Sequence, residues 1–322
     1  MKHYLGVDLG GTNIAVGVVD ENYRIIAKHC IPTKAGRSVT EIAEDLAAAS
    51  KHVIDKAGLS ISEFTSWGIG MPSCINPKTG LLVHSNNLGW KNIPILDTLR
   101  RLIGLPIIIE NDANCAALGE ALAGAARDYR DVIVITLGTG VGGGLIVNGK
   151  IYAGADQMGA ELGHTKIVYN GELCSCGQKG CFEAYASATA LVRQTQKAMQ
   201  ENPRSLMNEL CDSDFKKVTG RTAFDAARQE DMTALKVVNL YTEYIACGLS
   251  TLITIFRPEA IIIGGGISNE GSYLFNMINS KIFENTFSAH EVGVPPVIPA
   301  QLGNDAGIIG AAMLELCTGM RI

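Results

Sequence analysis

The sequence feature that most constrains the fold is a strand–turn–strand pattern that occurs in both halves of the chain. The stretch "GVDLGGTNIAVGVVD" lies near the start, and "ITLGTGVGGGLIVNGK" occupies residues 135–150. In each stretch, an apolar run leads into a turn of Gly and Thr and continues as a second apolar run. We therefore predict a duplicated βββαβα core with a cleft between the two copies.

Strand-like and helix-like segments alternate along the rest of the chain. Residues 38–57 carry apolar side chains at helical spacing, and Gly58 ends that helix. This alternation predicts an α/β fold. We expect an N-terminal domain over residues 1–115 and a larger C-terminal domain over 116–304. The last helix, within 305–322, is expected to pack back on the first domain.

Composition excludes several classes of protein. The net charge of -5 gives a nucleic-acid partner no electrostatic help. No apolar run reaches the roughly 18–20 residues that span a bilayer, and the start enters a strand without a signal peptide. Nine cysteines, mostly scattered, do not form a disulfide framework. We expect a soluble cytoplasmic protein with no nucleic acid and no membrane as partner.

The first glycine turn has two interpretations. It is either an ordinary hairpin or a nest of backbone N–H groups that binds phosphate, because paired glycines let a ligand approach the backbone closely. In the second case Asp8 would hold Mg²⁺ through water. The residues of this turn are Asp8, Gly10, Gly11, Thr12 and Asn13.

The second glycine turn, "LGTGVGGG", contains Gly138, Thr139 and Gly140. It matches G-x-G-x-x-G, but a strand is expected after it, whereas the dinucleotide fingerprint needs a helix there. Two such turns facing one cleft suit a nucleoside triphosphate. Gly265 and Gly266 follow a buried strand and either let adenine or ribose come close or form a tight turn.

A polar pair ends another buried strand. Asn111 and Asp112 follow the apolar run "LPIII" by one residue. A carboxylate in this place can act as a general base toward a bound substrate. Both residue types also cap helices well, so capping of the following helix is the alternative.

Three cysteines fall within eight residues in the stretch "CSCGQKGCFE". Cys174, Cys176 and Cys181 form C-x-C-x₄-C, and His164 lies upstream. Three thiolates and one imidazole make a closed, structural Zn²⁺ site; the alternative is free thiols. The loop would then fix Glu161 and Glu183 for binding a polyol, although both could be plain surface charges.

The motifs together resemble one family. "GVDLGGTN", "NNLGW", "ENDANCAALGE", "LGTGVGGGLIVNGK", "GAELGH", "CSCGQKGCFE" and "GGGIS" are similar to the ROK family of repressors and sugar kinases, most of all to its bacterial glucokinase branch. The resemblance covers nearly the whole chain. It implies the actin-like ATPase (ribonuclease H-like) fold and transfer of the ATP γ-phosphoryl group to the 6-hydroxyl of a hexose.

The resemblance also implies residue roles. Asp112 matches the catalytic base, and both glycine turns match phosphate-binding segments. His164 matches a residue that binds both sugar and zinc. The further sugar contacts that it implies are Asn87, Asn111, Glu161 and Glu183. The chain departs from the usual G-x-P-G at "GMPSC", which bears on sugar preference.

Alternatives stay open within this resemblance. Glucose is the expected substrate, while fructose, mannose or an N-acetylated amino sugar are rivals, and polyphosphate could replace ATP as donor. A sugar-responsive regulator is disfavoured because the first strand starts near residue 3, without room for a helix-turn-helix module. The family suggests a homo-oligomer, either a dimer or a tetramer.

Overall fold

The computed structural model describes residues 2–72, 74–76, 79–85 and 88–318. The chain divides into two compact units. Unit 1 comprises Met1–Val134, Gly144–Ala160 and Gln301–Ile322, and unit 2 comprises Ile135–Gly143 and Glu161–Ala300. The sequence suggested a division near residue 115. In the structure the segment after residue 115 belongs to unit 1, because the helix that it forms packs against the C-terminal segment.

The first sheet has the strand order β3-β2-β1-β4-β8. Its strands are β1 (His3–Leu9), β2 (Asn13–Asp20), β3 (Ile25–Pro32), β4 (Trp67–Met71) and β8 (Ile107–Asn111). A separate small sheet, which the sequence did not predict, consists of β5 (Cys74–Ile75), β6 (Leu82–Ser85) and β7 (Trp90–Ile93). The helices of unit 1 are α1 (Val39–Lys56), η1 (Ile61–Glu63), α2 (Ile95–Ile103), α3 (Asp112–Ala123), α11 (Asp305–Ala312) and α12 (Leu314–Thr318).

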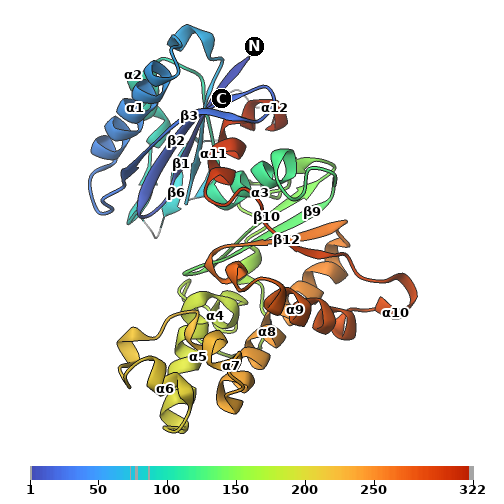
Figure 1. The fold of residues 1–322 in the computed structure, drawn as a ribbon. Coiled ribbons are helices and arrows are strands. Elements are labelled where there is room, and N and C mark those ends of the chain that lie inside the picture. Colours follow the sequence, from blue (N-terminus) through green and yellow to red (C-terminus); the bar gives the residue numbers. More distant parts are fainter. Residues whose placement is uncertain (1, 73, 77–78, 86–87, 319–322) are drawn as a thin grey trace. The chain divides into compact units, whose positions relative to one another are not determined.

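Strand β1 separates two cores. Alternate residues of a strand point to opposite faces, so Leu5, Val7 and Leu9 join the cluster that α1 and α2 cover. Tyr4 lies in the other cluster, together with the buried residues of α11. Figure 1 shows α1 and α2 on one face of this sheet and α3 and α11 on the other. Asp8 shares the α11 face with Tyr4.

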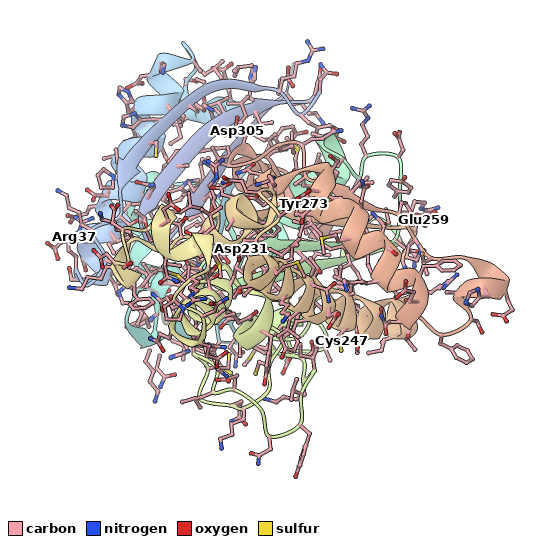
Figure 2. The ribbon with its side chains drawn as sticks, turned by 60° about the horizontal axis from the view of Figure 1, so that its bottom comes forward. Arg37, Asp231, Cys247, Glu259, Tyr273 and Asp305 are labelled. Atoms are coloured by element: carbon pink, nitrogen blue, oxygen red, sulfur yellow. The ribbon has the colours of Figure 1, made fainter. Side chains whose placement is uncertain are left out.

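Helix α11 packs very closely on the sheet because two strand positions lack side chains. A Cβ on Gly6 of β1 would overlap the carbonyl oxygen of Ile308, and one on Gly68 of β4 would overlap that of Ala311. The absence of side chains therefore lets the backbone of α11 lie against β1 and β4. The ion pair between Lys28 and Asp305 (2.9 Å) adds a contact at the first residue of α11, which Figure 2 labels.

Glu120 forms hydrogen bonds with the residues at which the chain returns to unit 1. Its side chain is 2% exposed. Its Oε2 accepts from the Ala125 N–H (2.8 Å), and its Oε1 accepts from the N–H groups of Gln301 (3.1 Å) and Leu302 (2.8 Å). Backbone N–H groups that are shielded from water need partners, and this buried carboxylate accepts from partly buried donors of two segments far apart in the sequence.

We expect Glu120→Ala to lower the free energy of unfolding by roughly 3–5 kcal/mol, because several partly buried N–H groups lose their acceptor at once and the buried carboxylate leaves a cavity. Urea denaturation followed by circular dichroism would measure the change. Glu44→Ala, at an exposed position of α1, is the matched control and should change stability by less than about 0.5 kcal/mol. A loss below about 1 kcal/mol for Glu120→Ala would contradict the anchoring role.

The second sheet repeats the order of the first. Its order is β11-β10-β9-β12-β13, so the duplicated core predicted from the sequence is confirmed. The strands are β9 (Val132–Leu137), β10 (Val141–Val147), β11 (Lys150–Ile151), β12 (Ala260–Gly264) and β13 (Val297–Pro299). Asn148 (φ 53°) and Gly149 (φ 75°) form the two-residue turn between β10 and β11, as the Asn–Gly pair predicts.

Helices make up most of unit 2. They are η2 (Leu162–His164), α4 (Glu183–Ala186), α5 (Ala188–Glu201), α6 (Leu206–Leu210), η3 (Phe215–Lys217), α7 (Thr222–Ala227), α8 (Met232–Phe256), η4 (Gly266–Glu270), α9 (Ser272–Asn285) and α10 (Ala289–Val292). Asp231 caps α8 by accepting from the Ala234 N–H (2.7 Å), and Figure 2 labels it there. In the part of the chain that the structure describes, no helix combines the length and apolarity needed to cross a membrane.

Candidate functional site

In unit 1, the topology brings several carboxylates to one edge of the first sheet. Strands β1 and β8 both run parallel to β4, so their carboxyl ends lie at the same edge. Asp8 is in register with Gly70 of β4, and Gly70 is in register with Glu110 of β8. Asp112 then begins α3. Ligands of open α/β sheets commonly bind beyond the carboxyl ends of the strands.

Burial and mutual repulsion govern the charges at this edge. Burial, and then the negative charge of Asp112, raise the pKa of Asp8 from 3.8 to about 7. Burial likewise raises the pKa of Glu110. The Oε1 of Glu110 accepts from the Asn111 N–H (2.9 Å) and from Nδ2 of Asn114 (3.0 Å). The edge therefore concentrates carboxyl groups that a cation would stabilise in the charged form.

Asn111 and Asp112 lie at the N-terminus of α3. The Oδ1 of Asn111 accepts from the N–H groups of Ala113 (2.8 Å) and Asn114 (3.2 Å), so the capping interpretation is confirmed for Asn111. Asp112 is partly exposed, and its Oδ1 accepts from the Ala113 N–H (2.9 Å). The positive end of the helix favours a carboxylate at this position.

The first glycine turn connects β1 to β2. Gly10 donates its N–H to the carbonyl of Asn13 (2.9 Å), while Gly11 is partly exposed and Thr12 is exposed. The buried residue Thr33 braces the turn, because its hydroxyl donates to the Gly10 carbonyl (2.6 Å) and its N–H donates to the Thr12 carbonyl (2.8 Å). Our sequence reasoning missed Thr33, because it follows the end of a different strand, β3, and lies far from the turn in the sequence.

The second glycine turn, in unit 2, is held by the start of α5. Gly138 donates its N–H to the Gly140 carbonyl (3.0 Å) and accepts from the Ala188 N–H (2.8 Å). The carbonyl of Thr139 accepts from the hydroxyl of Thr189 (2.8 Å). Strand β10 follows the turn directly, as predicted, so the helix that a dinucleotide fingerprint requires does not follow it.

The third glycine segment follows β12. Gly265 has φ 86°, and a Cβ there would overlap the carbonyl oxygen of Leu137. Glycine is therefore required by both conformation and close approach. Gly266 begins η4 and is exposed, with open space where a side chain would lie.

The four candidate zinc ligands lie together in unit 2. The Nδ1 or Nε2 of His164 and the sulfur atoms of Cys174, Cys176 and Cys181 are all within 4.8 Å of one another. The Sγ atoms of Cys176 and Cys181 are 3.7 Å apart, and the Sγ of Cys174 is 3.7 Å from Nδ1 of His164. An edge of a tetrahedron built on Zn–S bonds of ~2.3 Å is about 3.8 Å long, so this donor set fits Zn²⁺.

A short β-like ladder shapes the loop that carries these ligands. Lys166 forms an antiparallel bridge with Cys181, and Leu173 forms one with Lys179. The N–H of Phe182 donates to the Thr165 carbonyl (2.8 Å), next to the first bridge. The backbone thus brings the histidine end of the loop alongside its cysteine end.

Glu183 connects the cysteine loop to the second glycine turn. Its Oε1 accepts from the hydroxyl of Ser175 (2.6 Å), and its Oε2 accepts from the N–H of Val141 (3.1 Å). Glu161 precedes η2 and is exposed. Asn87 and Ser73, which the resemblance associates with the sugar, lie outside the described residues.

Comparison with known proteins identifies the family. The model described as "ROK family" matches residues 4–317. This chain belongs to the ROK family.

Among its ROK relatives, the glucokinase of Thermotoga maritima is 38% identical over 311 residues, covering 96% of each chain. An N-acetyl-D-glucosamine kinase of Haemophilus influenzae is 31% identical, covering 97% of this chain and 99% of the relative. The structure of a ROK glucokinase from Streptomyces griseus in complex with glucose and AMPPNP has a TM-score of 0.81 at 35% identity. The match covers 99% of this chain and 100% of the other. This similarity confirms the fold class predicted from the ROK motifs.

The raised pKa of Asp8 predicts a pH-dependent stability. Because the folded protein binds more protons than the unfolded chain between about pH 4 and 7, stability falls as pH rises through that window. In metal-free buffer at pH 8, the free energy of unfolding of Asp8→Asn, measured by urea denaturation, should exceed that of wild type by up to about 4 kcal/mol. The difference should shrink toward zero near pH 4. A difference that does not vary with pH would contradict the raised pKa of Asp8.

Proposed function

We propose that the chain is an ATP-dependent kinase that phosphorylates glucose at its 6-hydroxyl, yielding glucose 6-phosphate. The observation that carries this proposal is the near-full-length similarity to glucokinases, at 38% identity over 96% of both chains in the Thermotoga maritima relative. The carboxylates at the sheet edge and the two glycine turns would supply the chemistry that such a reaction needs.

Asp112 is proposed as the general base. It is partly exposed at the first residue of α3, where the helix N-terminus stabilises its charge. It would accept the proton of the 6-hydroxyl as that oxygen attacks the γ-phosphorus. Asn111 is proposed to contact the sugar beside it, since its Oδ1 caps the helix and its Nδ2 can donate.

Asp8 and the glycine turns are proposed to act on the phosphates. Exposed Thr12 and Asn13 of the first turn offer hydroxyl and amide groups, and the backbone of Gly138–Gly140 offers further donors. Mg²⁺, when bound, neutralises phosphate charge. Asp8 would hold that ion through water, and would do so as a carboxylate that has released its proton.

The cysteine loop is proposed to fix the sugar-binding groups of unit 2. His164, Cys174, Cys176 and Cys181 would hold Zn²⁺, which supplies rigidity rather than Lewis-acid chemistry, because all four positions are protein ligands. Glu161 and Glu183 would then accept from sugar hydroxyls. Glu183 adjoins the loop directly, through Ser175.

The experiment that tests the function is a coupled assay of the purified chain with ATP and, separately, polyphosphate across a panel of hexoses. Glucose with ATP should give the highest kcat/KM. N-acetyl-D-glucosamine belongs in the panel because one relative carries that name. A higher kcat/KM for any other hexose, or for polyphosphate as donor, would overturn the proposed substrate assignment.

Asp112→Asn is the companion variant for this assay. Its kcat should fall by about 10²–10⁴, the usual contribution of a general base, while glucose affinity is kept. Asp128→Asn, with a side chain that is 84% exposed, is the control and should turn over normally. Turnover by Asp112→Asn within a few-fold of wild type would remove Asp112 from the role.

Cys176→Ala should lose bound zinc and glucose affinity together, because three ligands hold zinc far less well than four and the loop then loosens. Elemental analysis of the purified variant and a glucose titration would measure both. Cys247→Ala, at an exposed cysteine of α8 labelled in Figure 2, should retain both. Zinc content equal to wild type in Cys176→Ala would refute the ligand assignment.

A further inference from the structure

The proposed zinc site carries surplus negative charge. Zn²⁺ brings two positive charges, three thiolates bring three negative charges, and a ligating imidazole is neutral. The site therefore has a net charge of one negative. Glu183 adds to it, since its Oε1 lies 3.4 Å from the sulfur of Cys174. Partly buried charge of one sign is costly unless a counter-charge lies close.

The sulfur atoms of the loop have different neighbours. The Sγ of Cys174 lies 3.9 Å from the hydroxyl of Ser175, a neutral group. Cys181 is fully buried, and its sulfur receives a charged donor.

That donor is Lys166. Its Nζ lies 3.1 Å from the sulfur of Cys181. The backbone brings the two side chains together, because Lys166 and Cys181 are directly opposite in an antiparallel bridge. Residues that face each other across such a bridge project their side chains to the same face, with Cβ atoms ~4.5–5.5 Å apart. The ammonium therefore reaches the sulfur without depending on a distant part of the fold.

We propose that Lys166 is a positioning residue of the zinc site: its ammonium donates to the Cys181 thiolate and compensates the surplus charge of the metal–thiolate centre. This inference rests on the zinc site proposed above. It assigns a fifth residue to the loop, one that does not touch the metal but raises the affinity of the loop for it. Groups of this kind typically change metal affinity by about 10–100-fold.

Lys179 provides an internal comparison. It lies in the same loop, two residues before Cys181, and has the same charge. Its bridge partner is Leu173, whose side chain is 66% exposed. A general electrostatic effect of loop charge would therefore act through both lysines, whereas a specific contact with the Cys181 sulfur acts through Lys166 alone.

The test measures zinc affinity of the full chain by competition with a chromophoric chelator. Lys166→Met should bind zinc about 10–100-fold more weakly than wild type. Lys166→Arg should recover most of the affinity, because a guanidinium also donates to the thiolate with a positive charge. Lys179→Met should stay within twofold of wild type.

A second measurement separates this role from a purely structural one. The metal-free forms of wild type and Lys166→Met should melt at the same temperature, and the rise in melting temperature on adding zinc should be smaller for the variant. At limiting zinc the KM for glucose should rise in Lys166→Met, and saturating zinc should restore it while kcat stays unchanged.

The outcomes distinguish the two proposals. Zinc affinity of Lys166→Met within twofold of wild type, or an equal loss in Lys179→Met, would overturn the role of Lys166 and leave the zinc site intact. Failure of wild type to bind zinc would instead refute the site itself. A lower melting temperature of metal-free Lys166→Met with unchanged zinc affinity would show a structural role and also overturn the proposal.

Discussion

The crowding of carboxyl groups at one edge of the first sheet is the constraint on which the candidate site depends. Parallel pairing of β1, β4 and β8 puts Asp8 and Glu110 in the same row, and α3 adds Asp112. Burial and repulsion then keep Asp8 protonated more readily than an ordinary aspartate. A metal-free protein bears this cost, and the closely packed backbone of α11 covers the same face of the sheet. The unfavourable charge is thus the feature that makes the edge receptive to a cation.

Local contacts explain what the sequence could predict. The helix over 38–57 is observed as α1, whose N-terminus carries the Ser38–Glu41 capping box, and the cysteine loop closes over a few residues. Strand alternation and glycine turns likewise depend on neighbours in the chain. These signals were enough for the duplicated core and for grouping the four proposed ligands. They also located Asp8 and Asp112 at strand ends.

Contacts between distant segments could not be predicted in the same way. Glu120 stands at the end of "ENDANCAALGE", yet its partners lie 181 and 182 residues further on. Thr33 braces a turn 23 residues earlier, and nothing in its own neighbourhood marks it. The small β5-β6-β7 sheet was missed because its strands are only two to four residues long, too short for a period-two pattern to stand out. Sequence reasoning therefore identified the candidate site residues more readily than the residues that support them through contacts with distant segments.

The return of the chain to unit 1 has a consequence for biosynthesis. Helix α11 supplies much of the second core of this unit, beside β1 and β8. The amino-terminal strands leave the ribosome long before that helix exists. About 300 residues separate β1 from α11, so at translation rates of about 5–20 residues per second the wait lasts on the order of 15–60 seconds. During this interval the face of β1 that bears Tyr4 has no α11 to cover it, and nascent chains would be open to chaperones or to aggregation on that side alone.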